Sequence, residues 1–290
     1  MGVLDTVRFI VRHPLGRKHP VANLVDWARW QIGSRLAPGP VIVPWIGSTR
    51  LVVSPGMAGA TGNIYVGLHE PDEMGFLLHL LRAGDHFIDV GANIGSFTIL
   101  AAGVVGARVD TFEPVGEALA SLARNIRVNA LELLVCVHAQ AVGSHVGEVL
   151  METGRDSMNK VLTGPAEEPS TGRQRVPMTT LDASLPGATP TLIKIDVEGF
   201  ENQVLAGAPK TLAHTAAVLI EVSKDPEQVY AHLVAAGLRP AHYDALHRRL
   251  EILDAPRLSD RGNALFVRDA AFVSERCRTA PRIAVKRTSI

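Results

Sequence analysis

The chain has 290 residues, of which 47% are hydrophobic and 20% are charged, as is usual for a globular protein with one large domain or two small ones. The formal net charge is zero, so no global charge argues for a nucleic-acid partner. The two cysteines lie far apart without a metal-ligand pattern, so we expect no disulfide framework and a cytoplasmic location. We find neither an apolar run of the roughly 20 residues that span a bilayer nor a secretory signal pattern.

Two helices are expected within residues 1–36. The apolar residues of the second recur at helical spacing: Val21, Leu24, Val25, Ala28 and Ile32. We expect this stripe to pack on the body of the protein or on a second copy in a homodimer. Further along, the sequence predicts short strands at 49–54 and 62–67 and a helix from about residue 70 to 81.

Both ends of the chain are basic. Residues 1–50 hold seven lysines or arginines against two acidic residues, and residues 271–290 hold five against one. Two interpretations stay open: these charges are solvated, or they contact an anionic membrane surface or an acidic partner. We therefore expect a helical basic extension over residues 1–45, a main domain over 46–270, and a flexible basic tail over 271–290.

From residue 86 onward, strands and helices alternate. Seven strands are expected in the main domain, at 86–90, 108–114, 133–142, 192–197, 216–223, 248–253 and 264–269. An extra strand at 146–153 and a polar loop at 154–174 interrupt the rhythm. Such alternation is typical of an α/β fold with a Rossmann-like, mostly parallel sheet that helices cover on both faces.

Four of the expected strands end in acidic residues: Asp89, Glu113, Asp196 with Glu198, and Glu221. A buried parallel strand has no structural need for an acid at its end. In sheets of this kind, ligands bind outside the carboxyl ends of the strands. The four strand ends are therefore expected to converge on one ligand-binding crevice.

The segment FIDVGANIG predicts a tight turn at this crevice. Gly91 permits the turn, and Gly95 lets the helix begin close to a ligand. Glu113, 22 residues after Gly91, is expected to accept hydrogen bonds from the ribose hydroxyls of an adenosine cofactor. A dinucleotide fingerprint needs a glycine where Asn93 stands, and the charge of Asp89 repels a pyrophosphate but attracts the amino group of S-adenosylmethionine. The residues therefore favour S-adenosylmethionine over a nicotinamide dinucleotide.

A second acidic group follows in LIKIDVEGFE. Lys194 and Asp196 lie on the same face of the expected strand, and the buried lysine is expected to pair with an acid. Asp196, Glu198 and Glu201 offer three carboxylates within six residues. Such a group can serve as a general base, bind substrate hydroxyls or hold a divalent cation. Glu221 is expected to form a third wall, and no His or Asn pattern accompanies it, so we predict no metal.

Four residues are expected to take part in catalysis: Lys194, Asp196, Glu198 and Glu221. We expect Glu201 to contact the substrate; the alternative is an exposed first-turn acid that stabilises the helix dipole. Asn159, in the polar loop, is expected to contact the acceptor; the alternative is an unstructured loop.

Several segments together resemble the FkbM-type methyltransferases: FIDVGANIGSFT, FEP, AVG, LIKIDVEGFENQVLAGA, LIEVS and NALFVR. The resemblance covers about residues 48–269, and KIDVEGFE is its most specific part. It implies a class I, Rossmann-like enzyme that uses S-adenosylmethionine, similar to O-methyltransferases of sugars and polyketides. It also implies cofactor contacts for Asp89, Gly91, Ala92, Asn93, Gly95, Glu113, Ala141 and Val142, the last two beside the adenine.

The sequence thus predicts an S-adenosylmethionine-dependent O-methyltransferase that acts on a hydroxyl of a sugar, glycolipid or polyketide-like metabolite. An NAD(P)-dependent oxidoreductase is one alternative, but it needs a catalytic Tyr/Lys or His pair, and none of Tyr65, Tyr230 and Tyr243 is followed by a lysine four residues on. A non-catalytic methyltransferase-like module, recruited through its basic ends, is the other. The intact acids at the strand ends argue against it.

Overall fold

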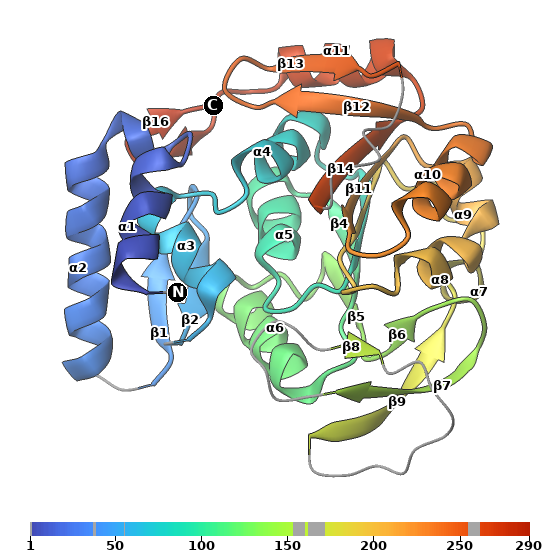
Figure 1. The fold of residues 1–290 in the computed structure, drawn as a ribbon, viewed down its shortest axis with the longest axis horizontal. Helices are drawn as coiled ribbons and strands as arrows, with labels where there is room; N and C mark the ends of the chain where they lie inside the picture. Colours follow the sequence, from blue (N-terminus) through green and yellow to red (C-terminus); the bar gives the residue numbers. More distant parts are fainter. Residues whose placement is uncertain (1, 37–38, 55, 153–159, 162–171, 255–261) are drawn as a thin grey trace.

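The computed structural model describes residues 2–36, 39–54, 56–152, 160–161, 172–254 and 262–290 (Figure 1). Asn159 lies outside these residues, so its contact with an acceptor stays a prediction. None of the described helices combines the length and the apolar character that a bilayer-spanning segment requires.

A large sheet forms the centre of the described structure, with the strand order β13-β12-β14-β11-β10-β3-β4-β5. Its strands are β3 (His86–Val90), β4 (Arg108–Phe112), β5 (Val135–His138), β10 (Leu192–Ile195), β11 (Ala217–Val222), β12 (Arg239–Asp244), β13 (Arg249–Ile252) and β14 (Gly262–Val267). The neighbours from β11 to β5 are parallel, whereas β14, β12 and β13 pair antiparallel. The α/β class and the mostly parallel, Rossmann-like sheet are confirmed.

This sheet has eight strands in the described part of the chain, one more than expected. The additional strand is β12, whose sequence RPAHYD contains Pro240 and little apolar alternation, features that argue against a central strand. It forms because Ala241 and Tyr243 are buried and because its backbone pairs with both β13 and β14. Tertiary pairing therefore outweighs the local sequence here.

A smaller sheet has the order β6-β9-β7-β8 among the described residues. Its strands are β6 (Ala141–Val142), β7 (Gly147–Glu152), β8 (Lys160–Val161) and β9 (Arg173–Thr179). The strand expected at 133–142 is therefore wrong as a single element, because the chain leaves the large sheet after His138. The extra strand expected at 146–153 is confirmed as β7, and β9 begins inside the segment expected to be a loop.

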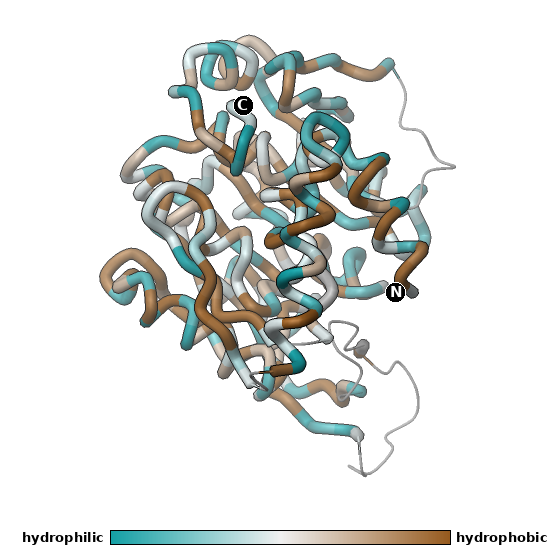
Figure 2. The backbone as a smooth tube through the Cα atoms, turned by 90° about the vertical axis from the view of Figure 1, so that its left-hand side faces the viewer, coloured by the Kyte–Doolittle hydropathy of each residue, from teal (hydrophilic) through white to brown (hydrophobic). Residues whose placement is uncertain are grey.

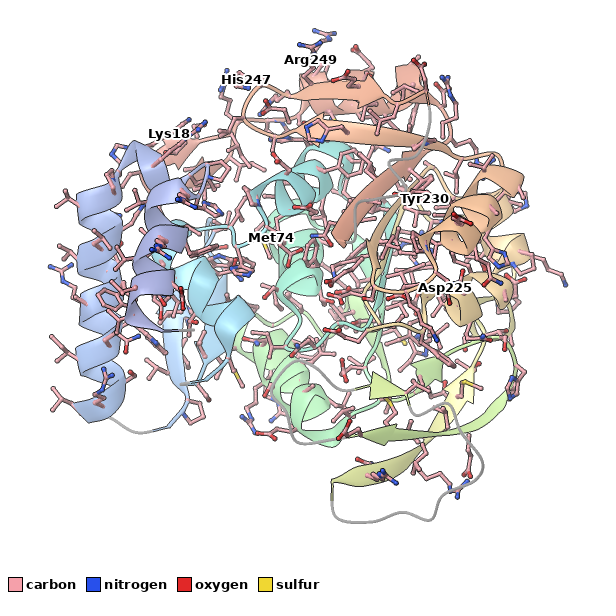
Figure 3. All side chains as sticks on the ribbon, in the orientation of Figure 1. Lys18, Met74, Asp225, Tyr230, His247 and Arg249 are labelled. Atoms are coloured by element: carbon pink, nitrogen blue, oxygen red, sulfur yellow. The ribbon has the colours of Figure 1, made fainter. Side chains whose placement is uncertain are left out.

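Helices cover both faces of the large sheet (Figure 1). One face carries α4 (Pro71–Leu80), α5 (Ser96–Ile99) with the π-helical turn η2 (Leu100–Val105), α6 (Gly116–Val128) and α11 (Ala270–Thr279). The other carries α7 (Leu181–Ser184), α8 (Glu201–Ala206), α9 (Pro209–Ala213) and α10 (Pro226–Ala235). Met74 of α4 and Tyr230 of α10, labelled in Figure 3, belong to the two separate apolar cores. Each central strand supplies both cores because successive side chains point to opposite faces.

Ahead of the large sheet lie α1 (Val3–Arg12), η1 (Gly16–Lys18), α2 (Pro20–Leu36), β1 (Val41–Pro44), β2 (Arg50–Val53) and α3 (Ala58–Val66). The two N-terminal helices and the strand near 49–54 are confirmed. The strand expected at 62–67 is wrong, because this segment is the end of α3. Tyr65 and Val66 pack against Ile10 of α1, and this contact outweighs the β-propensity of their sequence.

The apolar stripe of α2 is mostly exposed. Val21, Val25 and Ile32 are 74%, 43% and 62% exposed, so the expectation that they pack on the body of the protein is wrong. Of the stripe, Leu24 does pack on the body of the protein, together with Trp27 and Trp30. Figure 2, which faces this side of the molecule, shows hydrophobic residues among hydrophilic ones along the N-terminal helices. Contact with a second copy stays a prediction.

The last twenty residues, expected to form a flexible tail, form defined elements instead. They comprise most of α11 and the hairpin of β15 (Ala284–Val285) and β16 (Thr288–Ser289). Asp26 of α2 accepts contacts from Lys286 at 2.7 Å and from Arg287 at 3.0 Å. The two basic ends therefore lie side by side (Figure 1) because a carboxylate of one neutralises charges of the other.

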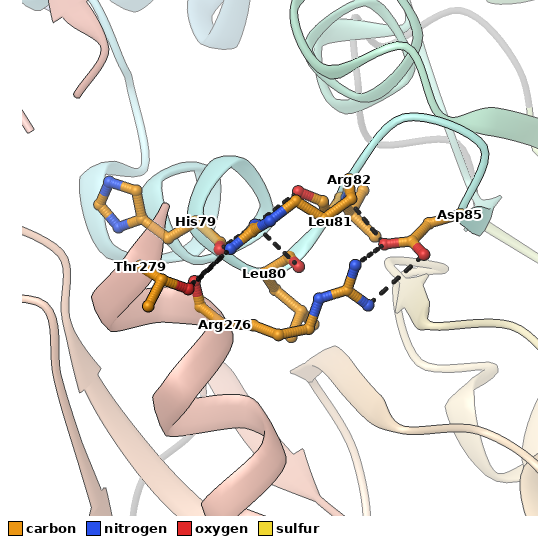
Figure 4. Close-up of polar contacts among 7 residues, drawn as sticks. All are labelled: His79, Leu80, Leu81, Arg82, Asp85, Arg276 and Thr279. Atoms are coloured by element: carbon orange, nitrogen blue, oxygen red, sulfur yellow. Dashed lines mark hydrogen bonds and ion pairs between the residues drawn. The ribbon is translucent and has the colours of Figure 1, made fainter. Parts of the chain in front are cut away.

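Arg82 joins the end of α4 to α11 (Figure 4). Its guanidinium donates to four carbonyl oxygens, those of His79, Leu80, Leu81 and Arg276. The guanidinium of Arg276 lies 2.8 Å from Asp85, at the turn before β3. Arg82 therefore supplies a charged donor to the carbonyls at the end of α4, which lack backbone partners within that helix.

Replacing Arg82 by alanine is expected to lower the free energy of unfolding by about 2–4 kcal/mol, because partly buried carbonyls lose a charged donor. Urea unfolding measures the change. Arg278→Ala is the matched control: it removes an exposed pair with Glu275 on α11 and is expected to cost less than about 1 kcal/mol. Equal losses in the two variants would contradict the assignment.

Candidate active site

The turn after β3 has a backbone that only glycine accommodates at two positions. Gly91 has φ 79° and Gly95 has φ 90°. A β-carbon on Gly91 would collide with the carbonyl oxygen of Asp196, and one on Gly95 would collide with the side chain of Leu122. The turn therefore passes directly against the end of β10. Asn93, within the turn, also has a positive φ of 53°.

Asp89 lies at the carboxyl end of β3 and is 1% exposed. Its Oδ2 accepts a hydrogen bond from the hydroxyl of Thr98 at 2.7 Å, whereas its Oδ1 has no hydrogen-bond partner among the described residues. Burial raises the pKa of this carboxyl. An unsatisfied buried carboxylate oxygen is costly, so this atom indicates a place for an external hydrogen-bond donor.

Glu113 follows β4 and holds the turn in place. It accepts hydrogen bonds from the backbone N–H groups of Asn93 at 2.8 Å and Val115 at 3.1 Å. Burial raises its pKa to about 7, although these two hydrogen bonds favour the charged form. Each carboxylate oxygen has two lone pairs, so the group keeps acceptor capacity for ligand hydroxyls.

Lys194 is the cation of the site. It is 7% exposed and pairs with Asp89 in the register of β10 and β3. Its Nζ donates to Asp196 at 2.7 Å and lies 4.7 Å from the centre of the Phe97 ring. Although burial opposes its charge, the negative charges of Asp196 and Glu70 raise its pKa. The expected pairing of the buried lysine with an acid is present.

Asp196 and Glu221 follow paired positions of the parallel strands β10 and β11, so their carboxyl groups lie next to each other. Burial, followed by the charge of Asp196, raises the pKa of Glu221 to about 8. Although burial acts in the opposite direction, Lys194 lowers the pKa of Asp196. These opposite shifts favour a charged Asp196 and a protonated Glu221 near neutral pH.

The segment after Asp196 forms a strained turn. Glu198 has φ 50° and Gly199 has φ 96°, and the charge of Glu198 also raises the pKa of Glu221. Glu201 is fully buried, so the alternative of an exposed first-turn acid is wrong. Its Oε1 accepts from the N–H of Gly199 at 2.8 Å, and its Oε2 has no partner among the described residues. Glu201 therefore supports the turn that carries Glu198.

The small residues expected near an adenine lie in buried positions. Ala92 donates its N–H to the carbonyl of Phe112 at 3.1 Å. Ala141 of β6 packs with Val115, and Val197 packs against the same cluster. Val115 lies two residues after Glu113, and Val197 directly follows Asp196. The strand β6 therefore lies close to both acids. Val142 points into the other core.

Three residues of the site were not anticipated: Thr98, Phe97 and Glu70. Thr98 also contacts the Thr111 hydroxyl at 3.2 Å, which fixes the orientation of Asp89. The sequence did contain a signal for Thr98: it is the one hydroxyl-bearing residue in the apolar run FTILAA, which follows the strand that contains Asp89. Glu70 directly precedes α4, so the sequence indicates only an acid at a helix start. Its charge acts on Lys194, and this proximity follows from the fold alone.

Solved structures with a similar chain course include an rRNA methylase from Streptococcus thermophilus, at 12% identity, covering 67% of this chain and 91% of that one with a TM-score of 0.40. A putative transferase from Pyrococcus horikoshii has 10% identity, coverages of 86% and 84%, and a TM-score of 0.44. A SAM-dependent O-methyltransferase from Thermotoga maritima has 10% identity, coverages of 75% and 66%, and a TM-score of 0.38. The chain has no significant match among curated proteins.

The sequence match to a family model is more direct. The methyltransferase FkbM domain matches residues 89–254, more than half of the chain. The matched range begins at Asp89 and contains Glu113, Lys194, Asp196 and Glu221, the charged residues that the fold brings together. The chain therefore belongs to the FkbM family of S-adenosylmethionine-dependent methyltransferases.

Proposed function

We propose that this methyltransferase acts on a hydroxyl group of a sugar, glycolipid or polyketide-like metabolite. The observation that carries the proposal is the pair of neighbouring carboxyl groups, Asp196 and Glu221, at the ends of β10 and β11, with pKa values shifted in opposite directions. An alcohol is a weak acid, so its methylation needs a positioned group that takes the proton. An acceptor that is already nucleophilic would not need such a pair.

The residues present fit S-adenosylmethionine. The unpaired Oδ1 of Asp89 suits the donor's ammonium group, and Glu113 suits its ribose hydroxyls. Gly91, Ala92, Asn93 and Gly95 bring the backbone close to the ligand, with Ala141 and Val142 as the candidates beside the adenine. When bound, the cofactor supplies an electrophilic methyl group.

Lys194 and Asp196 have separate roles in the proposal. Lys194 lowers the pKa of Asp196 and partly offsets the effect of burial on Asp89, so it favours the charged forms of both carboxyl groups. Asp196 orients the acceptor hydroxyl, and the Asp196–Glu221 pair receives its proton. The negative charge of Glu198 raises the pKa of Glu221 and so makes it a better proton acceptor. Glu201 fixes the turn that carries Glu198 and acts as a positioning residue for the substrate.

A cavity with both apolar and polar walls lies on the Asn263 side of this pair, and its polar side chains suit a hydroxylated acceptor. Its volume is about 240 Å³, and its polar lining includes Asp72, Glu73, His242 and Asn263. Asn263 stands opposite Glu221 in the register of β14 and β11. Burial raises the pKa of Glu73 to about 7, so this wall offers both donors and acceptors to sugar hydroxyls near neutral pH.

The acceptor is identified by incubating the protein with isotope-labelled S-adenosylmethionine and a metabolite extract of the source organism. Mass spectrometry is expected to find the label as a methyl ether on an alcohol oxygen. A label on nitrogen or carbon, or on nucleic acid in a parallel incubation, would contradict the proposal. Complete absence of transfer from a bound donor would favour the non-catalytic module.

With the acceptor in hand, kcat/KM is expected to rise about tenfold per pH unit up to about pH 8 and then level off. The sign follows from the pair: below the pKa of Glu221, its proton occupies the oxygen that must receive the acceptor proton. In Glu221→Gln the slope between pH 6 and 8 is expected to disappear, because Lys194 keeps the pKa of Asp196 low. Glu227→Gln, on the exposed surface of α10, is the control. An unchanged slope in Glu221→Gln would contradict the assignment.

A further inference from the structure

A second group of titratable side chains lies near the edge of the large sheet. Its members come from three neighbouring strands: His86 from β3, Asp110 from β4, and Cys136 with His138 from β5. The alternation of strand side chains places Asp110 on the opposite face from Thr111, which contacts Thr98 of the crevice. This group is therefore separate from the methyl-transfer site.

Asp110 is the centre of the group. Its Oδ1 lies 2.7 Å from Nε2 of His138, and its Oδ2 lies 2.8 Å from Nε2 of His86. The candidate ligand atoms of Asp110, Cys136 and His138 all lie within 4.8 Å of one another. The side chains of Asp110 and both histidines are 17–19% exposed, and Cys136 is exposed, so the group is reachable from solvent.

The sheet fixes these three side chains in place. Asp110 stands opposite Cys136 in the register of β4 and β5, and His138 lies two residues further along the same face. The His138 ring stacks on Phe112 with centroids 4.3 Å apart and an interplanar angle of 12°. The ligand atoms therefore converge without any rearrangement of the backbone.

The combination of thiol, imidazole and carboxylate is the donor set that zinc prefers. We propose that Asp110, Cys136 and His138 bind a Zn²⁺ ion, with His86 as a positioning residue on the second oxygen of Asp110. Tetrahedral zinc holds such ligand atoms about 3.3–3.7 Å apart, so binding needs side-chain adjustments on the order of 1 Å from the observed spacing. The orienting hydrogen bond from His86 has the form that commonly supports ligating carboxylates.

The fold provides an entry path to the proposed zinc site and links this site to Glu113. A cavity of about 300 Å³, lined by His86, Asp110 and Cys136 among others, provides an entry path and room for a water as fourth ligand. The carbonyl of His138 accepts a hydrogen bond from the N–H of Glu113 at 3.1 Å. Zinc therefore ties the edge strand β5 to β4 next to the acid expected to hold the cofactor ribose.

Cobalt titration of the chelator-treated, otherwise intact protein tests the site. One equivalent of Co²⁺ is expected to produce a thiolate-to-cobalt charge-transfer band in the near ultraviolet, together with intense visible bands of tetrahedral cobalt, and Zn²⁺ is expected to bleach both. Cys136→Ser is expected to lose the charge-transfer band. Absence of the band in the unmodified protein, or its persistence in Cys136→Ser, would overturn the proposal.

The chain offers matched controls. Cys277 is the other cysteine of the sequence, buried in α11, and Cys277→Ser is expected to keep the band. Because this buried position is sensitive to substitution, His145→Ala, at an exposed histidine, serves as a second control. His86→Ala is expected to keep the band while Co²⁺ affinity falls about 10- to 100-fold; unchanged affinity would remove its positioning role. Circular dichroism of each metal-free variant separates ligand loss from misfolding.

Discussion

Replacing Asp89 or Glu113 by alanine is expected to weaken S-adenosylmethionine binding at least about a hundredfold, because each change leaves a charged or polar group of the ligand without its buried partner. Asp89 carries an unpaired carboxylate oxygen in a buried position. Glu113 also holds the turn through Asn93 and Val115, so its loss acts on both the ligand and the backbone. Isothermal titration calorimetry with S-adenosylmethionine and S-adenosylhomocysteine measures the effect.

The matched control is Glu117→Gln, an exposed acid on the first turn of α6, which is expected to leave affinity unchanged. Asp89→Asn separates charge from shape, since the amide keeps the volume of the side chain but loses its negative charge. Thermal unfolding of each variant verifies the fold. Normal affinity in both alanine variants would refute the cofactor site.

Asp196→Asn is expected to reduce turnover by about 10²- to 10⁴-fold, the usual contribution of a general base, while affinity for S-adenosylmethionine changes little. The amide has no charge to pair with Lys194 and cannot accept a proton together with Glu221. Single-turnover rates with saturating labelled cofactor measure the loss of the chemical step separately from binding.

Asp225→Asn is the control for this change. Asp225 is exposed before α10 (Figure 3) and adopts φ 47°, a conformation that asparagine tolerates. Its turnover is expected to equal that of the unmodified protein. If turnover survives in Asp196→Asn, the proton-accepting role belongs to another group. A parallel loss of cofactor affinity would instead place Asp196 in the cofactor site.

The core of the site was predictable because it depends on strand ends. Apolar runs that stop at Asp89, Glu113, Asp196 and Glu221 imply parallel strands, and parallel strands bring their carboxyl ends to one edge. The register of β10 and β3 places Lys194 beside Asp89. From the sequence alone, one can say only that the buried lysine needs some acidic partner. Local sequence was sufficient wherever the neighbouring strand was itself predictable.

The errors share a different physical cause: tertiary contacts decided what local pattern left undetermined. The β12 strand depends on pairing with β13 and β14, and the end of α3 depends on Ile10. The C-terminal segment is fixed by Asp26, more than two hundred residues away. The burial of Glu201 was also not predictable from sequence, because glutamate is almost never fully buried unless it has a partner, and its partner here is the backbone N–H of Gly199.

The cluster around Asp110 illustrates the same limit for function. Asp110 comes from β4, whereas Cys136 and His138 come from β5, so no sequence motif contains all three ligands. Cys136 and His138 lie two residues apart, but a cysteine and a histidine at this spacing are not by themselves a metal-binding pattern. Such a pair becomes informative once the register of β4 and β5 is known. Sequence spacing detects ligand sets on one helix or loop, whereas a sheet assembles them across strands.

The central claim is that carboxylates at neighbouring strand ends enclose a methyl donor, and a crystal structure with S-adenosylhomocysteine tests it most directly. We expect the ligand's amino group within hydrogen-bonding distance of Asp89, directly or through one water, and its ribose on Glu113. A crevice that stays empty at saturating ligand, or one that binds NAD in its place, would contradict it.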